Sequence, residues 1–117
     1  MLQVNSIYEL MGKFNNEYKS LLDVIDNVIV VIDENYNLLY KNKAFDKYLN
    51  NYFIKEICAK IKKWNFLNEN KLEIFENYND KTIKITVLKI SNYHGKLEGY
   101  FLVANNIDEL SKDKNKL

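Results

Sequence analysis

Few side chains in this chain could do covalent or metal chemistry, and those few stand far apart. The sequence contains a single Cys, Cys58 within EICAKI, and a single His, His94, which precedes Gly95. A zinc site needs several Cys, His or carboxylate ligands in one place, so this pair gives no basis for a metal site. We interpret Cys58 as a small buried hydrophobe and His94 as an exposed loop residue.

Three carboxylates, those of Asp23, Asp26 and Asp33, lie close together in the sequence. They flank the expected ends of a helix and a strand, where Asp side chains commonly serve caps and turns. A Ser–His–Asp arrangement has no credible base here, because the single His lies in a loop. The sequence also lacks a glycine-rich phosphate loop, and we predict that the chain is not an enzyme. A small α+β enzyme stays a third hypothesis, which would need an acid–base pair in a cleft.

Size and composition indicate one folded domain. The chain has 117 residues and a mass of 14.0 kDa, and 47% of its residues are hydrophobic, which excludes a disordered chain. Its net charge is +1 and all 17 basic residues are Lys, whereas proteins that read DNA sequence depend on the bidentate Arg side chain. We therefore expect no direct nucleic-acid binding.

The same features bear on the compartment of the protein. A single Cys fits a reducing cytoplasm. No apolar run approaches the roughly 18 residues of a membrane-spanning helix, and the N-terminus lacks the basic start and apolar core of a signal peptide. We predict a cytoplasmic protein that does not bind a membrane.

An apolar residue recurs at alternating steps of three and four along the first part of the chain. This spacing is typical of a heptad seam. It predicts one amphipathic helix from Val4 to Ile25, with Gly12 weakening its middle. The seam could pack on its own domain, or part of it could pair with a second chain, and we favour the second interpretation. The dimer-interface candidates are Val4, Ile7, Met11, Phe14, Tyr18, Leu21 and Ile25.

The next segment predicts two strands and a helix. Residues 28–32, VIVVI, are apolar and β-branched at every position, which favours a strand that is covered on both faces. Residues 33–37, DENYN, predict a turn, and residues 38–41 the returning strand. Asn42 can cap the following helix, which runs to Leu49, by offering its side-chain oxygen to free amide groups.

The remainder predicts short helices and then three strands. Apolar spacing indicates the helices within residues 52–66, and LNENK at residues 67–71 indicates a loop. Asn106 and Glu109 have the spacing of a capping box, which predicts a short helix over residues 107–112. We expect the strands at residues 72–77, 82–90 and 97–104.

These elements predict an α+β fold. Five antiparallel strands in a chain of this length need helices to cover one face of the sheet. The strands at residues 28–32 and 97–104 are apolar on both faces, so we expect them to be central or neighbouring. Their second face also needs cover, and the N-terminal helix offers the only spare apolar surface. We therefore expect a five-stranded antiparallel sheet with short helices on one face and the N-terminal amphipathic helix on the other.

Three segments in this order resemble PAS domains, a family of sensor and dimerisation modules. They are VIVVIDENYNLLYKNKAF with Asn42 before the first core helix, TIKITVLKI followed by a Gly-containing hairpin, and the ending GYFLVANNIDEL. The resemblance covers residues 20–110. Where PAS domains often carry a D-I-T-E-like junction, this chain has Asn106-Ile107-Asp108-Glu109, so the usual Asp contact of the family is not carried over.

The resemblance implies a sensory and dimerisation module at the N-terminus of a bacterial regulator, in a transcription or two-component system. Residues 1–27 would form the dimerisation helix, residues 28–106 the PAS core, and residues 107–117 the start of a linker. An output domain would follow in the same chain, such as a sigma-54-dependent activator or a histidine kinase. The alternative is a ligand-free scaffold that dimerises the output domains.

The expected interior between sheet and helices could be a plain core or a small ligand pocket. Its candidate residues are Tyr40, Phe45, Ile57, Ile61, Trp64, Ile85 and Tyr100. The segment between Leu49 and Lys71 is shorter than in many PAS domains, which argues against a bulky cofactor. Flavin-binding members carry a longer Cys motif than that around Cys58, and haem-binding members place a His on a core helix. We therefore expect no haem or flavin, and at most a small unidentified ligand.

Overall fold

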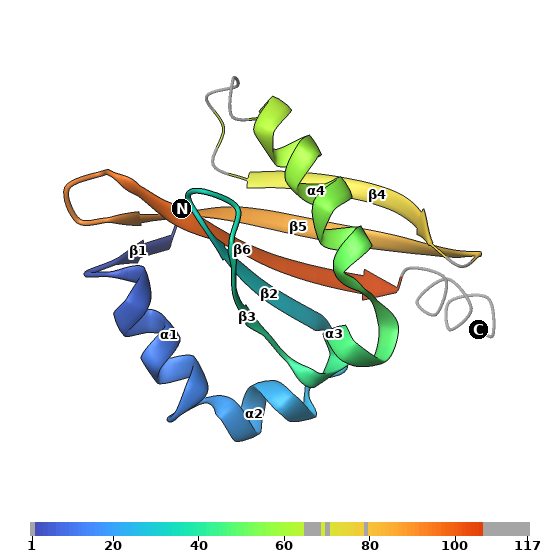
Figure 1. The fold of residues 1–117 in the computed structure, drawn as a ribbon, viewed down its shortest axis with the longest axis horizontal. Helices are drawn as coiled ribbons and strands as arrows, with labels where there is room; N and C mark the ends of the chain where they lie inside the picture. Colours follow the sequence, from blue (N-terminus) through green and yellow to red (C-terminus); the bar gives the residue numbers. More distant parts are fainter. Residues whose placement is uncertain (1, 65–68, 70, 79, 107–117) are drawn as a thin grey trace, which may run out of the picture.

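The computed structural model describes residues 2–64, 69, 71–78 and 80–106. Ten elements form a six-stranded sheet with four helices (Figure 1). In chain order they are β1 (Leu2–Val4), α1 (Ile7–Asn15), α2 (Lys19–Val24), β2 (Val28–Asp33), β3 (Leu38–Lys41), α3 (Lys43–Tyr48), α4 (Asn51–Trp64), β4 (Lys71–Tyr78), β5 (Lys81–Asn92) and β6 (Leu97–Asn106).

The five predicted strands are present as β2 to β6, and every pairing among them is antiparallel. β2 lies between β3 and β6, and β6 also pairs with β5, so the two strands that are apolar on both faces are neighbours, as predicted. The sequence analysis missed β1, a short strand that runs parallel to β5 at Leu2↔Ile90. β4 pairs with the first part of β5 and β1 with its last part (Figure 1).

Helices cover both faces of the central strands, which confirms the predicted fold class. Val28, Val30 and Ile32 of β2 belong to a hydrophobic cluster with α3 and α4. Ile29 and Val31, which alternate with them, belong to a second cluster with α1. Since successive strand residues point to opposite faces, this double cover explains why β2 has no polar alternation.

The prediction of one helix from Val4 to Ile25 is wrong. Val4 ends β1, α1 stops at Asn15, and α2 starts again at Lys19. The side chains of Asn15 and Asn16 donate to the carbonyls of Met11 and Gly12, at 2.9 and 2.8 Å, in the last turn of α1. Asn is disfavoured in helix interiors because its side chain competes for backbone hydrogen-bonding groups in this way. The apolar seam therefore continues in the sequence across residues 16–18, where the helical backbone is interrupted.

The prediction of several short helices over residues 52–66 is corrected to the single helix α4 of 14 residues. Its buried residues recur at helical spacing without a Gly or Pro to interrupt it. The expected helix over residues 107–112 lies outside the described residues, as does most of the expected loop at 67–71.

Asn42 caps α3 as predicted, and it also makes bonds that the sequence did not indicate. Its Oδ1 accepts hydrogen bonds from the amides of Ile29, at 3.0 Å, and Phe45, at 3.4 Å. Its Nδ2 donates to the carbonyls of Leu22, at 3.1 Å, and Asn27, at 2.9 Å. Asn42 is 1% exposed, so one buried amide joins α2, β2 and α3.

Asn42→Ala should lower the free energy of unfolding by about 3 kcal/mol, because each buried group left without its partner costs about 1–3 kcal/mol. Asn50→Ala is the matched control, since Asn50 directly precedes α4 and, among the described residues, its Oδ1 accepts the Phe53 amide alone, at 3.3 Å. Loss of such a cap costs about 1 kcal/mol. Urea denaturation measures both, and equal losses would contradict a central role for Asn42.

Substitution by Ala should change the stability of the protein in opposite directions at Gly99 and at Gly12. A Cβ at Gly99 would meet the Ile32 carbonyl oxygen and lie 2.6 Å from Cδ1 of Ile7, whereas one at Gly12 would meet nothing within 4 Å. Gly99→Ala should destabilise by about 1–3 kcal/mol through overpacking. Gly12→Ala should stabilise by up to about 1 kcal/mol, as expected inside a helix. Thermal denaturation decides, and a stabilised Gly99→Ala variant would refute the close approach of α1 to the sheet.

Candidate ligand site and dimer surface

Six of the seven predicted pocket residues meet in one cluster between the sheet and the helices α3 and α4. Each of them is at most 3% exposed. The cluster combines side chains from α3, α4, β5 and β6, so the predicted interior exists as a place in the fold. Its use as a ligand pocket stays a prediction. The six residues are Phe45, Ile57, Ile61, Trp64, Ile85 and Tyr100.

The structure places Tyr40, the seventh candidate, on the opposite face of the sheet. Tyr40 pairs with Val31 in the β2–β3 ladder and packs against Phe14 of α1, with ring centroids 5.3 Å apart. Its hydroxyl is buried and has no hydrogen-bond partner within the described part of the chain. Burial, and to a smaller degree the Asp23 carboxylate, raise the pKa of Tyr40. Strand alternation decides the face, and the register of β3 was not fixed by the sequence.

Three aromatic rings, two of them stacked, lie next to one another in the interior. Tyr36 stacks on Tyr100 at 5.8 Å, and Tyr100 lies 6.4 Å from Trp64. The Lys62 ammonium lies over the Tyr36 ring at 4.9 Å, and that of Lys89 over the Trp64 ring at 4.6 Å. The sequence analysis missed Tyr36, which lies in the DENYN turn with a φ of 67°. An aromatic residue in a turn gives no signal of where its ring points.

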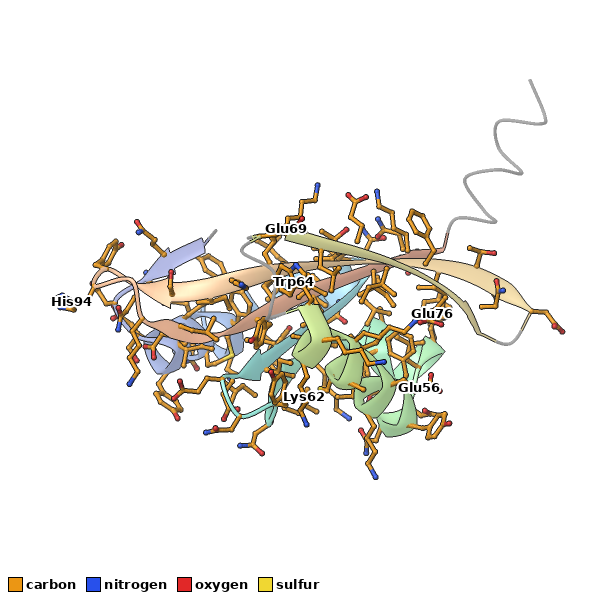
Figure 2. All side chains as sticks on the ribbon, turned by 90° about the horizontal axis from the view of Figure 1, so that it is seen from above. Glu56, Lys62, Trp64, Glu69, Glu76 and His94 are labelled. Carbon is orange, nitrogen blue, oxygen red and sulfur yellow. The ribbon has the colours of Figure 1, made fainter. Side chains whose placement is uncertain are left out.

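The indole of Trp64 holds a buried polar atom in the cluster. Trp64 is 3% exposed, and its Nε1 has no hydrogen-bond partner among the residues that the structure describes. Figure 2 shows Trp64 against the middle of the sheet, where α4 ends. A buried donor without an acceptor is costly, so this atom is a candidate contact for a ligand.

Cys58 and His94 occupy the predicted surroundings. Cys58 is buried and free, and burial raises the pKa of its thiol while the nearby Lys62 ammonium lowers it to a smaller degree. His94 is exposed in the turn between β5 and β6, at one end of the molecule, whereas Trp64 lies near its middle (Figure 2). Within the described ranges, no three His, Cys, Asp or Glu side chains gather in a way that could hold a metal ion.

Asp33 serves a turn, as predicted. Its Oδ1 accepts hydrogen bonds from the amides of Asn35 and Asn37, at 2.8 and 2.9 Å. These bonds close the turn between β2 and β3, in which Tyr36 stacks on the Tyr100 ring. A carboxylate that accepts local backbone bonds is a structural group, and nothing in its contacts indicates acid–base chemistry.

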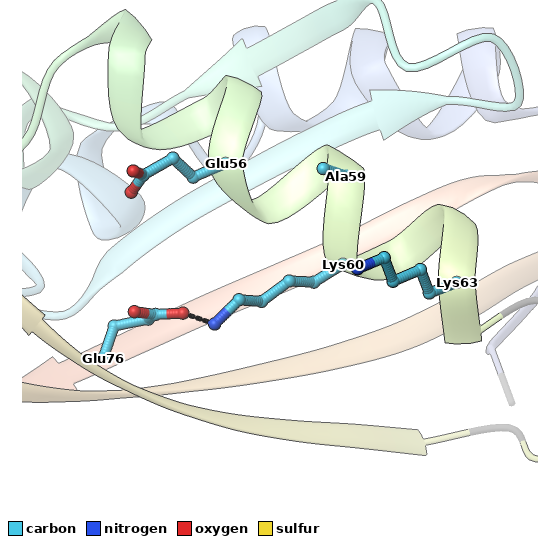
Figure 3. Close-up of a pocket in the computed structure, with 5 residues that line it drawn as sticks. All are labelled: Glu56, Ala59, Lys60, Lys63 and Glu76. Atoms are coloured by element: carbon cyan, nitrogen blue, oxygen red, sulfur yellow. Dashed lines mark ion pairs between the residues drawn. The ribbon is translucent and has the colours of Figure 1, made fainter.

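A shallow groove of about 310 Å³ lies on the outer side of α4, beside β4 (Figure 3). An ion pair between Lys60 and Glu76 crosses it. The groove is lined by charges of both signs, and all its lining side chains are exposed except that of Glu76, which is half-buried. The Lys60–Glu76 pair joins residues far apart in sequence, so the sequence alone gives no signal for it. The lining residues are Glu56, Ala59, Lys60, Lys63 and Glu76.

The structure divides the heptad seam into a buried and an exposed half. Ile7, Met11 and Phe14 are buried in the cluster that joins α1 to the sheet, and Val4 is half-buried beside them. Beyond the break between the two helices, three seam residues are exposed: Tyr18 (40%), Leu21 (65%) and Ile25 (38%).

Val24, which the heptad spacing did not select, is 78% exposed, and none of the six residues of α2 is buried. We call Tyr18, Leu21, Val24 and Ile25 the α2 patch. The patch offers four apolar side chains on and beside one short helix, and an apolar surface of this kind is typical of a protein contact.

No helix in the part of the chain that the structure describes is long and apolar enough to cross a membrane. Comparison of the sequence with known proteins gives no match to any family model and none to any curated protein.

Comparison of the fold with solved structures does give matches, at low sequence identity. The PAS domain of BvgS from Bordetella pertussis is 14% identical with a TM-score of 0.59, over 93% of this chain and 96% of that one. A sensory box sensor histidine kinase from Vibrio cholerae is 15% identical with a TM-score of 0.56, over 85% and 93%. A PAS domain from Colwellia psychrerythraea is 17% identical with a TM-score of 0.53, over 86% and 97%. Together with the strand order and the helices on both faces, these likenesses show that the chain has the fold of a PAS domain.

Proposed function

We propose that the chain is a cytoplasmic, non-catalytic sensory and dimerisation module of a bacterial signal-transduction or transcription regulator. Structures with the same fold include a PAS domain of BvgS and a sensor histidine kinase. The observation that carries the proposal is the arrangement on the two faces of the sheet. One face covers an aromatic interior, and the other holds α1 and positions the exposed α2 patch.

In the proposed mechanism, a small ligand or a partner changes the packing of the interior and the change reaches both ends of the module. β6 contributes Tyr100 to the interior and continues to Asn106, after which an output domain would follow. Asn42 contacts Phe45 of the interior through its Oδ1 and Leu22 of α2 through its Nδ2. A shift of α3 would therefore move α2 through a single buried side chain. The output domain would be a sigma-54-dependent activator or a histidine kinase.

The proposed dimer forms through the α2 patch. α2 is too short to be stable by itself. Its Leu22 packs on the second cluster, but Leu21 and Val24 are mostly exposed and gain little from their own domain. Covering Leu21 and Val24 with a second copy would remove two large apolar side chains from water, each worth about 1.5–3 kcal/mol when fully buried. The first half of the seam is already used inside the chain, so only the second half is offered to a partner.

Leu21→Asp should convert the dimer to a monomer without loss of the fold, because an unpaired carboxylate at the contact is costly and Leu21 has no packing role inside the chain. Light scattering after size exclusion gives the mass, which should fall from twice to once 14.0 kDa. Tyr93→Asp is the control, since Tyr93 is 63% exposed in the turn between β5 and β6, outside the α2 patch.

The Phe14→Asp variant distinguishes a dimer that forms through the α2 patch from one that forms through the whole heptad seam. Phe14 is 9% exposed inside its own domain, so a carboxylate there should unfold the protein or cost several kcal/mol. A Phe14→Asp variant that folds normally and is monomeric would favour the original heptad interface over the α2 patch. A dimeric Leu21→Asp variant would rule out the patch.

The alternative is a ligand-free scaffold that only holds output domains together. Native mass spectrometry of protein purified from its own host distinguishes the two, because a sensor should retain a small molecule of fixed mass. Unfolding the protein in the spectrometer should release that molecule. Repeated spectra of empty protein, with no thermal shift across a metabolite panel, would leave the scaffold as the better account.

A further inference from the structure

We propose that the ring of Tyr36 is a lid on the aromatic interior, which opens when the turn between β2 and β3 changes conformation. The inference rests on the proposed sensory function, because an open lid would let a small ligand reach the interior. It is carried by the backbone of this turn, by a second turn of the same kind in the chain, and by the contacts of the ring.

The turn between β2 and β3 places an aromatic residue where the backbone disfavours one. Tyr36 has a φ of 67°, in the left-handed region, in which a bulky side chain is strained. Its neighbours Asn35 and Asn37 are of the residue type that adopts this conformation more readily. The left-handed position nevertheless belongs to Tyr36, so the turn holds this ring in place against backbone strain.

The turn between β5 and β6, residues 92–96, is a second turn of this kind. Oδ1 of Asn92 accepts hydrogen bonds from the amides of His94 and Lys96, at 2.9 and 3.0 Å. The amide of Gly95 donates to the Asn92 carbonyl at 2.9 Å, and Gly95 takes the left-handed position with a φ of 82°. Gly has no Cβ and adopts this conformation without steric strain.

The two turns have the same hydrogen bonds and differ in the residue at the left-handed position. Like Asn92, Asp33 accepts hydrogen bonds through its side chain from the amides two and four residues later. In both turns the amide three residues later donates to the carbonyl of the first residue. That donor belongs to Tyr36 in one turn and to Gly95 in the other. Since Gly fits this turn without strain, the backbone does not require Tyr36, and the ring is what Tyr36 adds.

Two contacts hold the ring over the interior. Tyr36 stacks on Tyr100, with centroids 5.8 Å apart and the ring planes at 10° to each other. The Lys62 ammonium lies 4.9 Å from the centroid of the Tyr36 ring. Tyr36 is half-buried against the cluster that α3 and α4 cover, whereas Tyr100 is fully buried. Displacement of the Tyr36 ring would therefore open the interior at Tyr100.

The ring can move without disturbing the sheet. The pairing of β2 with β3 extends to Ile32↔Leu38, and Tyr36 lies in the turn beyond it, whereas most of the cluster belongs to strands and helices. Opening loses one ring contact and one cation–π contact, both of them weak. It also relieves the strain of the left-handed backbone, which offsets part of that loss. The lid is therefore held less firmly than the rest of the interior.

Nuclear magnetic resonance relaxation dispersion tests the movement, with residues 92–96 as the internal control. We expect exchange on the microsecond-to-millisecond timescale for the amides of residues 33–37 and for the Tyr100 ring. We expect none for residues 92–96, where Gly95 removes the strain. No exchange at residues 33–37, or exchange of the same size in both turns, would overturn the lid.

Trp64 reports whether the ring of Tyr36 closes the interior, because it is the only Trp in the chain and its ring centroid lies 6.4 Å from that of Tyr100. Tyr36→Gly removes the ring and fits the turn, so the fold should remain. Acrylamide should quench the Trp64 fluorescence several-fold more strongly in Tyr36→Gly than in the unchanged protein or in Tyr36→Phe, which keeps a ring. Tyr93→Gly, in the other turn, is the control. Equal quenching in Tyr36→Gly and the unchanged protein would refute the lid.

Gly95→Tyr tests the strain itself. A Cβ at Gly95 would meet no atom within 4 Å, so a loss of stability in this variant reports the backbone and not a clash. We expect the melting temperature to fall by several degrees, and to fall less in Gly95→Asn, because Asn adopts the left-handed conformation more readily. An unchanged melting temperature of Gly95→Tyr would contradict the strain that favours opening.

Failure of this proposal can be told apart from failure of the sensory function. If native mass spectrometry finds a retained small molecule but residues 33–37 show no exchange, the sensor stands and the lid falls. If residues 33–37 exchange as expected but the protein from its own host is empty, the lid stands and the sensory function falls.

Discussion

The buried amide of Asn42 is the interaction on which the arrangement of this module depends. It is 1% exposed and uses its oxygen and its nitrogen to reach three elements, α2, β2 and α3. No side chain of α2 is fully buried, although Leu22 packs half-buried against the second cluster, so the bond from Asn42 to the Leu22 carbonyl adds a specific constraint on where that helix lies. A buried side-chain amide whose hydrogen bonds are all formed favours one arrangement of the elements it joins. Apolar contacts alone would be compatible with several arrangements.

The second constraint is a sheet that is covered on both faces. Alternate residues of β2 enter two separate hydrophobic clusters, so the same strand contacts the aromatic interior on one side and α1 on the other. A strand of this kind cannot shift toward one cluster without disturbing the other, since protein interiors are close-packed. This shared packing is a physical basis for the proposed coupling between a ligand in the interior and the α2 patch.

Much of this fold could be predicted from the sequence, because its signals are local. The run VIVVI, the DENYN turn and the cap at Asn42 lie within a few residues of the structures they specify. The features that were not predicted depend on long-range contacts or on one competing interaction. β1 is only three residues long and is held by pairing with β5, and the heptad seam concealed a break that two Asn side chains impose. Six interior residues were found by their apolar character, but the register that sends Tyr40 to the other face was not visible, nor was the ring position of Tyr36.

The most direct test of the account is the distance between two α2 helices in solution. A spin label at Val24→Cys, in a Cys58→Ala background, would report on the α2 patch, because Val24 is 78% exposed and Cys58 is the only native Cys. Helices in contact lie about 8–10 Å apart, so the account predicts one narrow population of label distances, on the order of 20 Å with label length added. Labels that show no intermolecular coupling, or only broad long distances, would contradict dimerisation through α2.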